Sequence, residues 1–434
     1  MRITFSNSSF SPLEIPEANL VAVLSPQEGA EPAPVAHLAE SALDHPIGSQ
    51  PLERLAAPRS KVLLLVDDIT RQTPAWALVP SLLRRLAQAG VSREDIRILI
   101  AAGTHTRMTR EELEGKLGAE ILKGFSVTLH HWRDEENLKT IGATENGTPI
   151  RVNRMLGEAD IVIGVGQIVP HRVMGFTGGA SIVQPGVSGP EITGHTHWMS
   201  AFYTGAQIMG IAANPVRLEV EKIARLAGLR FIVNVVMDSR HRVKHVVAGD
   251  PVEAHRQGAE YSAAIFGASQ PALADIVVAE SYPADYDLWQ AGKGIYAAEL
   301  AVRPGGTVIL ITPCPHGVSE EHPEVEKFGY LSFREVRELV ERKELRDLVA
   351  AAHIAHVGRV IREIARGIMV SPGIASEVER RIGFEPAASP QLAVEKALAQ
   401  QGPAASVVIL KQGGNILPVV AEHSATQSLA PAGS

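Results

Sequence analysis

Three apolar runs in the first half of the sequence each end in polar or glycine-rich residues. The runs are Lys61–Val66, Ile96–Ala101 and Asp160–Val165, and Arg230–Val236 is a fourth. An unbroken apolar run of this length is typical of a strand buried on both faces, as in a parallel sheet. Helical sequence between the runs, such as Pro74–Ala89, predicts a doubly wound α/β layer. Ligands in such folds bind beyond the carboxyl ends of the strands, where the polar residues lie.

The same pattern restarts near residue 268, which indicates a second domain. Asp275–Ala279 and Thr307–Ile311 are two further strands of the buried type, and helical sequence follows from Ser332. The sequence therefore predicts two α/β domains with mostly parallel sheets and an active site in the cleft between them. The expected parts are an N-terminal domain over 1–267, a second α/β domain over 268–385, a segment over 386–421 that could return to the first domain, and a flexible tail over 422–434. Residues 1–60 are expected to form one short strand followed by irregular chain, and Ser406–Leu410 to form a late strand.

Composition and charge exclude several classes of protein. The net charge of −7 over 434 residues argues against nucleic-acid or anionic-membrane partners, because both require a basic surface. The single cysteine, Cys314, excludes a disulfide framework and a thiolate-rich metal site. The N-terminus has no signal-peptide pattern, and no apolar run approaches the ~18 residues that span a bilayer. We therefore expect a cytoplasmic protein. The charge does not exclude a small anionic substrate, because a pocket can be locally positive inside an acidic protein.

The segment after the first strand, Asp67–Pro74, combines carboxylates, hydroxyls and an arginine. The planar guanidinium of Arg71 can hold a carboxylate or phosphate through two hydrogen bonds. Asp68 and Thr70 beside it are candidate cofactor contacts. The alternative is a capped helix start with a local Asp–Arg pair.

The second strand is followed by Gly103-Thr104-His105. The glycine lets the chain turn sharply and leaves His105 at the edge of the sheet, where a neutral imidazole can take a proton. The alternative is a loop histidine that is hydrogen-bonded to its own turn.

The most specific segment is Pro170–Val187, which contains His171 and the run Gly178-Gly179-Ala180-Ser181. The double glycine permits close approach of the backbone to a phosphate. Farther on, His195 and His197 are two residues apart, so they share a face on a strand but not on a helix. One histidine acting alone as a metal ligand needs no such geometry. The alternative is a glycine-rich loop with incidental histidines.

The last segment, Leu288–Gly294, carries Gln290 and Lys293. Side chains three apart project to one side of a helix, so this pair can hold a substrate carboxylate by hydrogen bond and charge. The alternative is a solvated lysine near a helix start. Arg172 could meet a second acidic group and favour a malate-like substrate, or it could be a surface residue.

These four segments, in this order between residues 67 and 294, resemble the lactate racemase family. The family pattern is Asp-x-Thr-Arg-Pro, then Gly-Thr-His, then Pro-His…Gly-Phe-x-Gly-Gly-Gly-Lys…Pro-Gly with a distal histidine, then Gln-x-x-Lys. The resemblance implies a racemase or epimerase of a lactate- or malate-like 2-hydroxyacid. It also implies a nickel-pincer nucleotide as cofactor, a pyridinium-3,5-bisthiocarboxylic acid mononucleotide that holds nickel.

The resemblance assigns roles to individual residues. Ser181 stands where the family has the lysine that tethers the cofactor, so we expect the nucleotide to bind non-covalently at Gly178, Gly179 and Ser181. Gln72 replaces the proline of the first segment, which should alter the rigidity of that loop. The remaining matches are His197 with the nickel ligand, His105 and His171 with the paired acid/base histidines, Arg71 with the arginine beside the substrate, and Gln290 and Lys293 with the residues that grip its carboxylate.

The implied mechanism is reversible hydride transfer. One histidine removes the hydroxyl proton while hydride passes to the cofactor, and the planar 2-oxoacid then takes hydride back on its other face. The second histidine serves the opposite enantiomer. One alternative is a nickel- or nucleotide-binding relative without racemase activity. Another is a nicotinamide-dependent oxidoreductase. The absence of a Gly-x-Gly-x-x-Gly motif after the first strand of either domain argues against this second alternative. A metallohydrolase that uses His195 and His197 is a further, weaker alternative.

Overall fold

The computed structural model describes residues 1–29, 31–104 and 108–421, and the chain divides into two compact units. We call residues 28–196 and 210–264 the N-terminal unit. Residues 1–27, 197–209 and 265 onward form the C-terminal unit. The chain thus enters and leaves the C-terminal unit twice, whereas the sequence assigned the whole of 1–267 to one domain. The tail over 422–434 lies outside the described residues.

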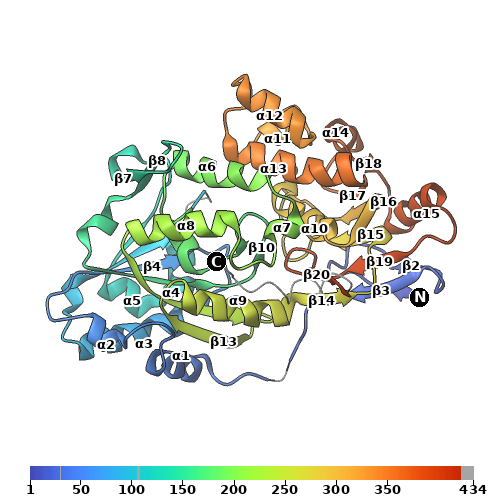
Figure 1. Cartoon of the computed structure of the whole chain (residues 1–434). Coiled ribbons are helices and arrows are strands. Elements are labelled where there is room, and N and C mark those ends of the chain that lie inside the picture. Colours follow the sequence, from blue (N-terminus) through green and yellow to red (C-terminus); the bar gives the residue numbers. More distant parts are fainter. Residues whose placement is uncertain (30, 105–107, 422–434) are drawn as a thin grey trace, which may run out of the picture. The chain divides into compact units, whose positions relative to one another are not determined.

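A six-stranded sheet in the order β6-β5-β4-β9-β12-β13 forms the centre of the N-terminal unit (Figure 1). Its strands are parallel except for β13 at one edge. The chain runs outward from β4 to β6 and then returns to β9 on the other side of β4. The order reverses between β4 and β9, and a ligand binds beyond the carboxyl ends of the strands at such a point. The strands are β4 (Val62–Asp67), β5 (Ile96–Ala101), β6 (Ser126–Leu129), β9 (Ile161–Gln167), β12 (Leu229–Met237) and β13 (Val243–Gly249).

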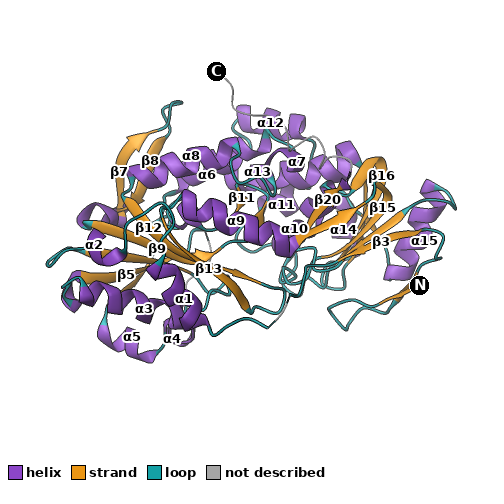
Figure 2. Cartoon of the chain, turned by 60° about the horizontal axis from the view of Figure 1, so that its bottom comes forward, coloured by secondary structure: helices purple, strands orange, loops and turns teal. Residues whose placement is uncertain are grey.

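Helices cover both faces of this sheet, with α1, α3, α4 and α5 on one side and α8 and α9 on the other (Figure 2). Every residue of β4 is buried, as its unbroken apolar run predicted. Residues 1–60 were expected to hold one short strand and irregular chain, but they contain two helices. The helices are α1 (Val35–Asp44), α2 (Leu52–Leu55), α3 (Ala75–Gln88), α4 (Arg110–Leu117), α5 (Ala119–Gly124), α8 (Pro215–Leu226) and α9 (Glu253–Phe266); the small ribbons are β7 (Leu138–Ala143) with β8 (Pro149–Asn153) and β10 (Pro170–His171) with β11 (Gly175–Phe176).

The C-terminal unit contains a wholly parallel sheet in the order β18-β17-β16-β15-β19-β3. Alternate residues of β15 pack into two different cores: Val277 lies in the cluster that includes α10, and Ile276 and Val278 lie in the cluster that includes α15. Both faces are therefore covered, which explains the continuous apolar runs. The strands are β3 (Leu20–Leu24), β15 (Ala274–Glu280), β16 (Val302–Ile311), β17 (Arg366–Val370), β18 (Glu385–Pro386) and β19 (Val407–Leu410).

The expected late strand is β19, and it lies between β15 and β3 of the C-terminal unit. The segment over 386–421 therefore stays in this unit, and β3 from the N-terminal stretch pairs with β19 in the same sheet. The sequence did not identify β17, because this strand is short and lies within a helical stretch. The helices are α7 (Gly205–Ile208), α10 (Leu288–Glu299), α11 (Glu324–Phe328), α12 (Phe333–Glu341), α13 (Leu348–Gly358), α14 (Ser376–Ile382) and α15 (Pro390–Gln401), and the remaining strands are β1 (Arg2–Ile3), β2 (Leu13–Glu14), β14 (Gly267–Gln270) and β20 (Leu417–Val420).

The predicted class, two α/β domains with mostly parallel sheets, is confirmed. The location of an active site between the domains stays a prediction. In the described part of the chain, no helix is both long and apolar enough to cross a membrane.

Candidate functional site

A buried ion pair organises the carboxyl end of β4. Asp67 Oδ1 lies 2.8 Å from Lys116 Nζ, and Asp67 Oδ2 accepts a 2.5 Å hydrogen bond from Thr73. Burial raises the pKa of Asp67, and the charge and hydrogen bond of Lys116 act in the opposite direction. Lys116 also donates to the backbone carbonyls of Asp68 and Arg71, at 3.0 and 2.8 Å. This lysine therefore fixes the course of the loop after β4, and no feature of the sequence around it marked it for that role.

The three candidate residues of this loop lie together. Thr70 Oγ1 donates to Asp68 Oδ1 at 2.6 Å, and Arg71 Nη1 donates to Thr70 Oγ1 at 3.3 Å. Asp68 is buried, whereas Arg71 is half-buried. Because β4 borders the point where the strand order reverses, these groups stand where a ligand is expected.

The double glycine is required by packing within the fold. Gly178 and Gly179 have φ of 76° and 57°, in the left-handed region that favours glycine. A Cβ on Gly178 would lie 2.9 Å from Asn234 Oδ1, and one on Gly179 would lie 2.8 Å from the His255 ring. The N–H of Gly179 donates to Asn234 Oδ1 at 2.7 Å. The predicted contact of these glycines with a phosphate stays a prediction, since this N–H already has a partner.

Arg217 holds the glycine-rich loop from the inside. It is completely buried and donates to three loop carbonyls, those of Met174 at 3.3 Å, Gly178 at 3.1 Å and Phe176. Burial lowers the pKa of Arg217 to about 9. His255 Nε2 donates to the carbonyl of the intervening residue, Thr177, at 3.0 Å. Burial first, and then the charge of Arg217, keeps the pKa of His255 well below its usual value. Neither residue was predicted from the sequence, because both lie far along the chain from the loop.

His171, Arg172 and Ser181 belong to the same segment as this loop. His171 is half-buried on β10, and its Nδ1 accepts a hydrogen bond from the N–H of Val173 at 3.3 Å. In the neutral ring, Nδ1 therefore carries the lone pair and Nε2 the proton. Arg172 is only 2% exposed, so its interpretation as a surface residue is wrong. Ser181 Oγ donates to the carbonyl of Gly178 at 3.0 Å.

His195 and His197 lie on the helix α6 (Pro190–Ala201). Residues two apart on a helix point in different directions, so the two rings cannot chelate one metal ion. The metallohydrolase interpretation thereby loses its geometric basis. His195 Nδ1 contacts Thr148 Oγ1 at 3.2 Å within the N-terminal unit, whereas His197 belongs to the C-terminal unit.

The end of α6 that carries His197 is anchored within the C-terminal unit. Ser200 Oγ donates to the backbone carbonyl of His197 at 2.6 Å and accepts from Nε2 of the buried His356 at 3.1 Å. Arg359 donates to the carbonyls of Ala201 at 2.6 Å and Tyr203 at 2.5 Å. These contacts fix the backbone at His197 while its side chain is half-buried.

The predicted carboxylate-binding pair lies on one side of α10, as expected. Lys293 Nζ donates to Gln290 Oε1 at 2.9 Å. Asp287 caps this helix by accepting from the N–H of Gln290 at 2.8 Å, and burial raises its pKa. His105, the remaining predicted acid/base residue, lies outside the described residues.

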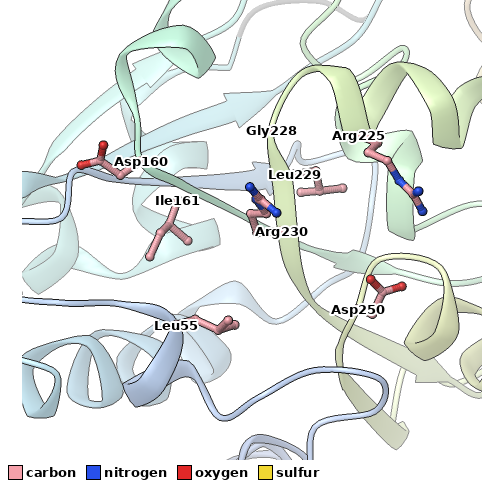
Figure 3. Close-up of a pocket in the computed structure, with 8 residues that line it drawn as sticks. All are labelled: Leu55, Asp160, Ile161, Arg225, Gly228, Leu229, Arg230 and Asp250. Carbon is pink, nitrogen blue, oxygen red and sulfur yellow. The ribbon is translucent and has the colours of Figure 1, made fainter.

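A cavity of about 620 Å³ lies in the N-terminal unit (Figure 3), and none of the groups described above lines it. It is lined by Ile161 and by Leu229 and Arg230, the first residues of β9 and β12. The cavity therefore lies at the amino ends of the strands, opposite the edge that carries the candidate residues.

The buried His130 should make the fold sensitive to acid. Its Nε2 donates to the carbonyl of Ser188 at 3.1 Å, its Nδ1 accepts from Asn153 at 3.2 Å, and burial lowers its pKa from 6.5 to about 4. Between these values the unfolded chain binds a proton that the folded chain does not. The free energy of unfolding should therefore fall as pH drops from 6.5 towards 4, by about 3 kcal/mol from this residue. Urea unfolding at pH 7 and pH 5 should show about 2 kcal/mol of this loss, because pH 5 lies only part of the way from 6.5 to 4. The pH dependence should shrink in His130→Gln, and an unchanged pH dependence in that variant would mean that His130 is not its source.

Comparison with known proteins identifies the family. The model for the lactate racemase N-terminal domain matches residues 6–209, and that for the C-terminal domain matches 269–418. The lactate racemase of Lactiplantibacillus plantarum is 30% identical over 392 residues, which cover 87% of this chain and 89% of that protein. The lactate racemase of Thermoanaerobacterium thermosaccharolyticum is 29% identical over 309 residues, covering 70% and 72% of the two chains.

Solved structures agree with this result. The lactate racemase apoprotein of Thermoanaerobacterium thermosaccharolyticum matches with a TM-score of 0.84 at 25% identity, over 96% of this chain and 99% of that one. A protein from Thermotoga maritima shares the fold, with a TM-score of 0.71 at 21% identity over 91% and 100% of the two chains. Both domains, the sequence and the fold thus lead to one conclusion: this chain belongs to the lactate racemase family and is an isomerase.

Proposed function

We propose that this chain racemises a 2-hydroxyacid of the lactate or malate class. The observation that carries the proposal is the pair Gln290 and Lys293 on α10, whose polar ends meet at 2.9 Å. An amide and an ammonium group at that distance can share one carboxylate, by hydrogen bond and by charge. The membership of the chain in a racemase family supports a reaction at the neighbouring carbon.

We propose nickel held in a pincer nucleotide as the cofactor, with His197 as the nickel ligand from the protein. The donor chemistry fits, because imidazole suits nickel and the backbone at His197 is fixed by Ser200 and Arg359. Asp68, Thr70 and the loop with Gly178, Gly179 and Ser181 would hold the nucleotide. Ser181 has no amine for a thioamide link, so binding would be non-covalent. When bound, the cofactor would supply a reversible hydride acceptor.

The residues of the chain would manage the protons and the substrate. His171 would take the hydroxyl proton of one enantiomer and His105 that of the other, since the planar 2-oxoacid must be approached from both faces. The N–H of Val173 contacts His171 Nδ1 at the long distance of 3.3 Å, so a proton arriving at Nδ1 would displace only a weak contact. Arg71 would stabilise the negative charge that develops on the substrate.

Intact-mass and metal analysis tests the cofactor proposal. Protein made together with the cofactor-synthesis enzymes should contain nickel and racemise lactate, and denaturation should release the nucleotide and leave the mass of the bare chain. Protein made without those enzymes should be inactive. A persistent mass increase after denaturation would refute non-covalent binding. The absence of nickel and nucleotide from both preparations would refute the cofactor.

Arg172 should decide between substrates with one and two acidic groups. Its guanidinium is buried, and a cation there favours a second carboxylate, as in malate. In Arg172→Gln we expect kcat/KM for malate to fall about tenfold or more relative to that for lactate, which corresponds to ~1.4 kcal/mol. Lys293→Met is the matched control, because it should lower kcat/KM for malate and lactate alike. An unchanged malate-to-lactate ratio in Arg172→Gln would remove the special role of Arg172.

A further inference from the structure

A second cluster of metal-binding groups lies in the C-terminal unit. It consists of His322, Glu324 at the start of α11 and Asp347 at the start of α13. One ligand atom from each residue can be chosen so that all three lie within 4.8 Å of one another. None of these residues belongs to the candidate site described above.

His322 places a buried nitrogen beside the carboxylate of Asp347. The residue is 4% exposed, and its ring stacks on that of Trp289 with centroids 3.7 Å apart and an interplanar angle of 16°. Nδ1 has no hydrogen-bond partner among the described residues, and Asp347 Oδ2 is 3.5 Å away. A buried polar atom without a partner is costly, so a ligand that satisfies it would stabilise this region.

Each of the two carboxylates can offer an oxygen to a cation. Asp347 Oδ1 accepts from the N–H groups of Val349 and Ala350, at 2.8 and 3.0 Å, which fixes the carboxylate and leaves Oδ2 towards His322. Glu324 Oε2 is buried and also lacks a hydrogen-bond partner within the described part of the chain. A protonated His322 could satisfy Asp347 alone, whereas a divalent cation would satisfy all three groups.

We propose that His322, Glu324 and Asp347 bind a divalent transition-metal cation such as Zn²⁺. One imidazole and two carboxylates form a common donor set for such ions, and water would complete the coordination. Ligand atoms about 2.1 Å from a metal lie roughly 3 to 4 Å apart, so a small contraction of the cluster suffices.

The bound cation would support the helix that carries the proposed substrate-binding pair. The loop before His322 holds the start of α10, because the carbonyls of Gly317 and Val318 accept from the N–H groups of Leu288 and Trp289, each at 3.0 Å. Trp289 of α10 also stacks on the His322 ring. Metal binding would therefore fix both the loop and the first turn of α10. This consequence rests on the proposed function, whereas the metal site itself does not.

The test uses untagged full-length protein that carries His197→Ala and is made without the cofactor-synthesis enzymes, so that neither the nucleotide nor His197 can hold metal. After dialysis against a chelator, calorimetry with Zn²⁺ should show one site per chain. His322→Phe keeps a ring against Trp289 but removes the ligand, and it should weaken Zn²⁺ binding about 100-fold or more. Glu324→Gln, a change at a partly exposed helix start, should weaken it by at least about tenfold.

His316→Phe is the matched control, since His316 lies in the same loop and stacks on Tyr286 outside the cluster, with ring centroids 3.9 Å apart. Its Zn²⁺ affinity should equal that of the parent. Circular dichroism verifies that each variant is folded. The proposal is overturned if the parent binds no Zn²⁺, if it binds Mg²⁺ in preference, or if Glu324→Gln and His322→Phe bind Zn²⁺ as the control does. Since no step measures racemisation, the result is independent of the proposed function.

Discussion

His171→Ala should lower racemase turnover by about 10²- to 10⁴-fold, the usual contribution of a positioned acid/base group. Conversion of either enantiomer into the other should slow to the same extent, because each complete conversion uses both histidines, one on each side of the substrate. Chiral chromatography of lactate, started from each enantiomer, measures the loss. His195→Ala is the matched control. His195 lies on α6, contacts Thr148 and has no role in the proposed mechanism, so its replacement should leave turnover nearly unchanged.

A single-turnover experiment separates an acid/base role of His171 from a structural one. Protein that carries the cofactor is mixed with a single enantiomer of lactate and quenched with acid, in a separate experiment for each enantiomer. The wild type should form the 2-oxoacid in both experiments. His171→Ala should form it from only one, and His105→Ala from only the other. A structural defect would suppress both equally. Full racemase activity in both single variants would mean that neither histidine is an acid/base group.

Lys116→Met should destabilise the N-terminal unit by about 3–5 kcal/mol, the usual cost of removing one partner from a buried ion pair. The lysine side chain is 3% exposed, and its loss would leave the buried Asp67 carboxylate without its cation. The carbonyls of Asp68 and Arg71 would also lose a donor. Urea unfolding measures the stability, and racemase activity should fall as well because the loop after β4 would lose its shape.

Two further variants test the explanation. Adding Asp67→Asn to Lys116→Met removes the uncompensated charge, so it should restore part of the stability. Lys123→Met is the control, since Lys123 is 69% exposed and lies 3.5 Å from Glu120 in a surface pair worth less than about 1 kcal/mol. If Lys116→Met and Lys123→Met cost the same, the buried pair with Asp67 does not organise this loop.

Several strands of the two sheets followed from the sequence, because burial on two faces leaves an unbroken apolar run. The strands β6, β13 and β18 were not predicted. β4, β5, β9 and β12 lie where these runs were found, and β19 was recognised in the same way. The strand β17 was not, because its five residues lie within a helical stretch. The helix α6 was undecided, because the alternation of His195 and His197 fits a strand as well as a helix until the backbone is known.

What the sequence by itself determined is local: which short segments are buried strands, which polar residues follow them, and that Gln290 and Lys293 share one side of a helix. Only the tertiary structure decided which groups from distant parts of the chain meet. Lys116 reaches Asp67, Arg217 reaches the loop with Gly178, and His322 turns towards Asp347. Periodicity reports the direction of a side chain relative to its own backbone, whereas such long-range partners depend on how strands and helices pack, which no local pattern encodes.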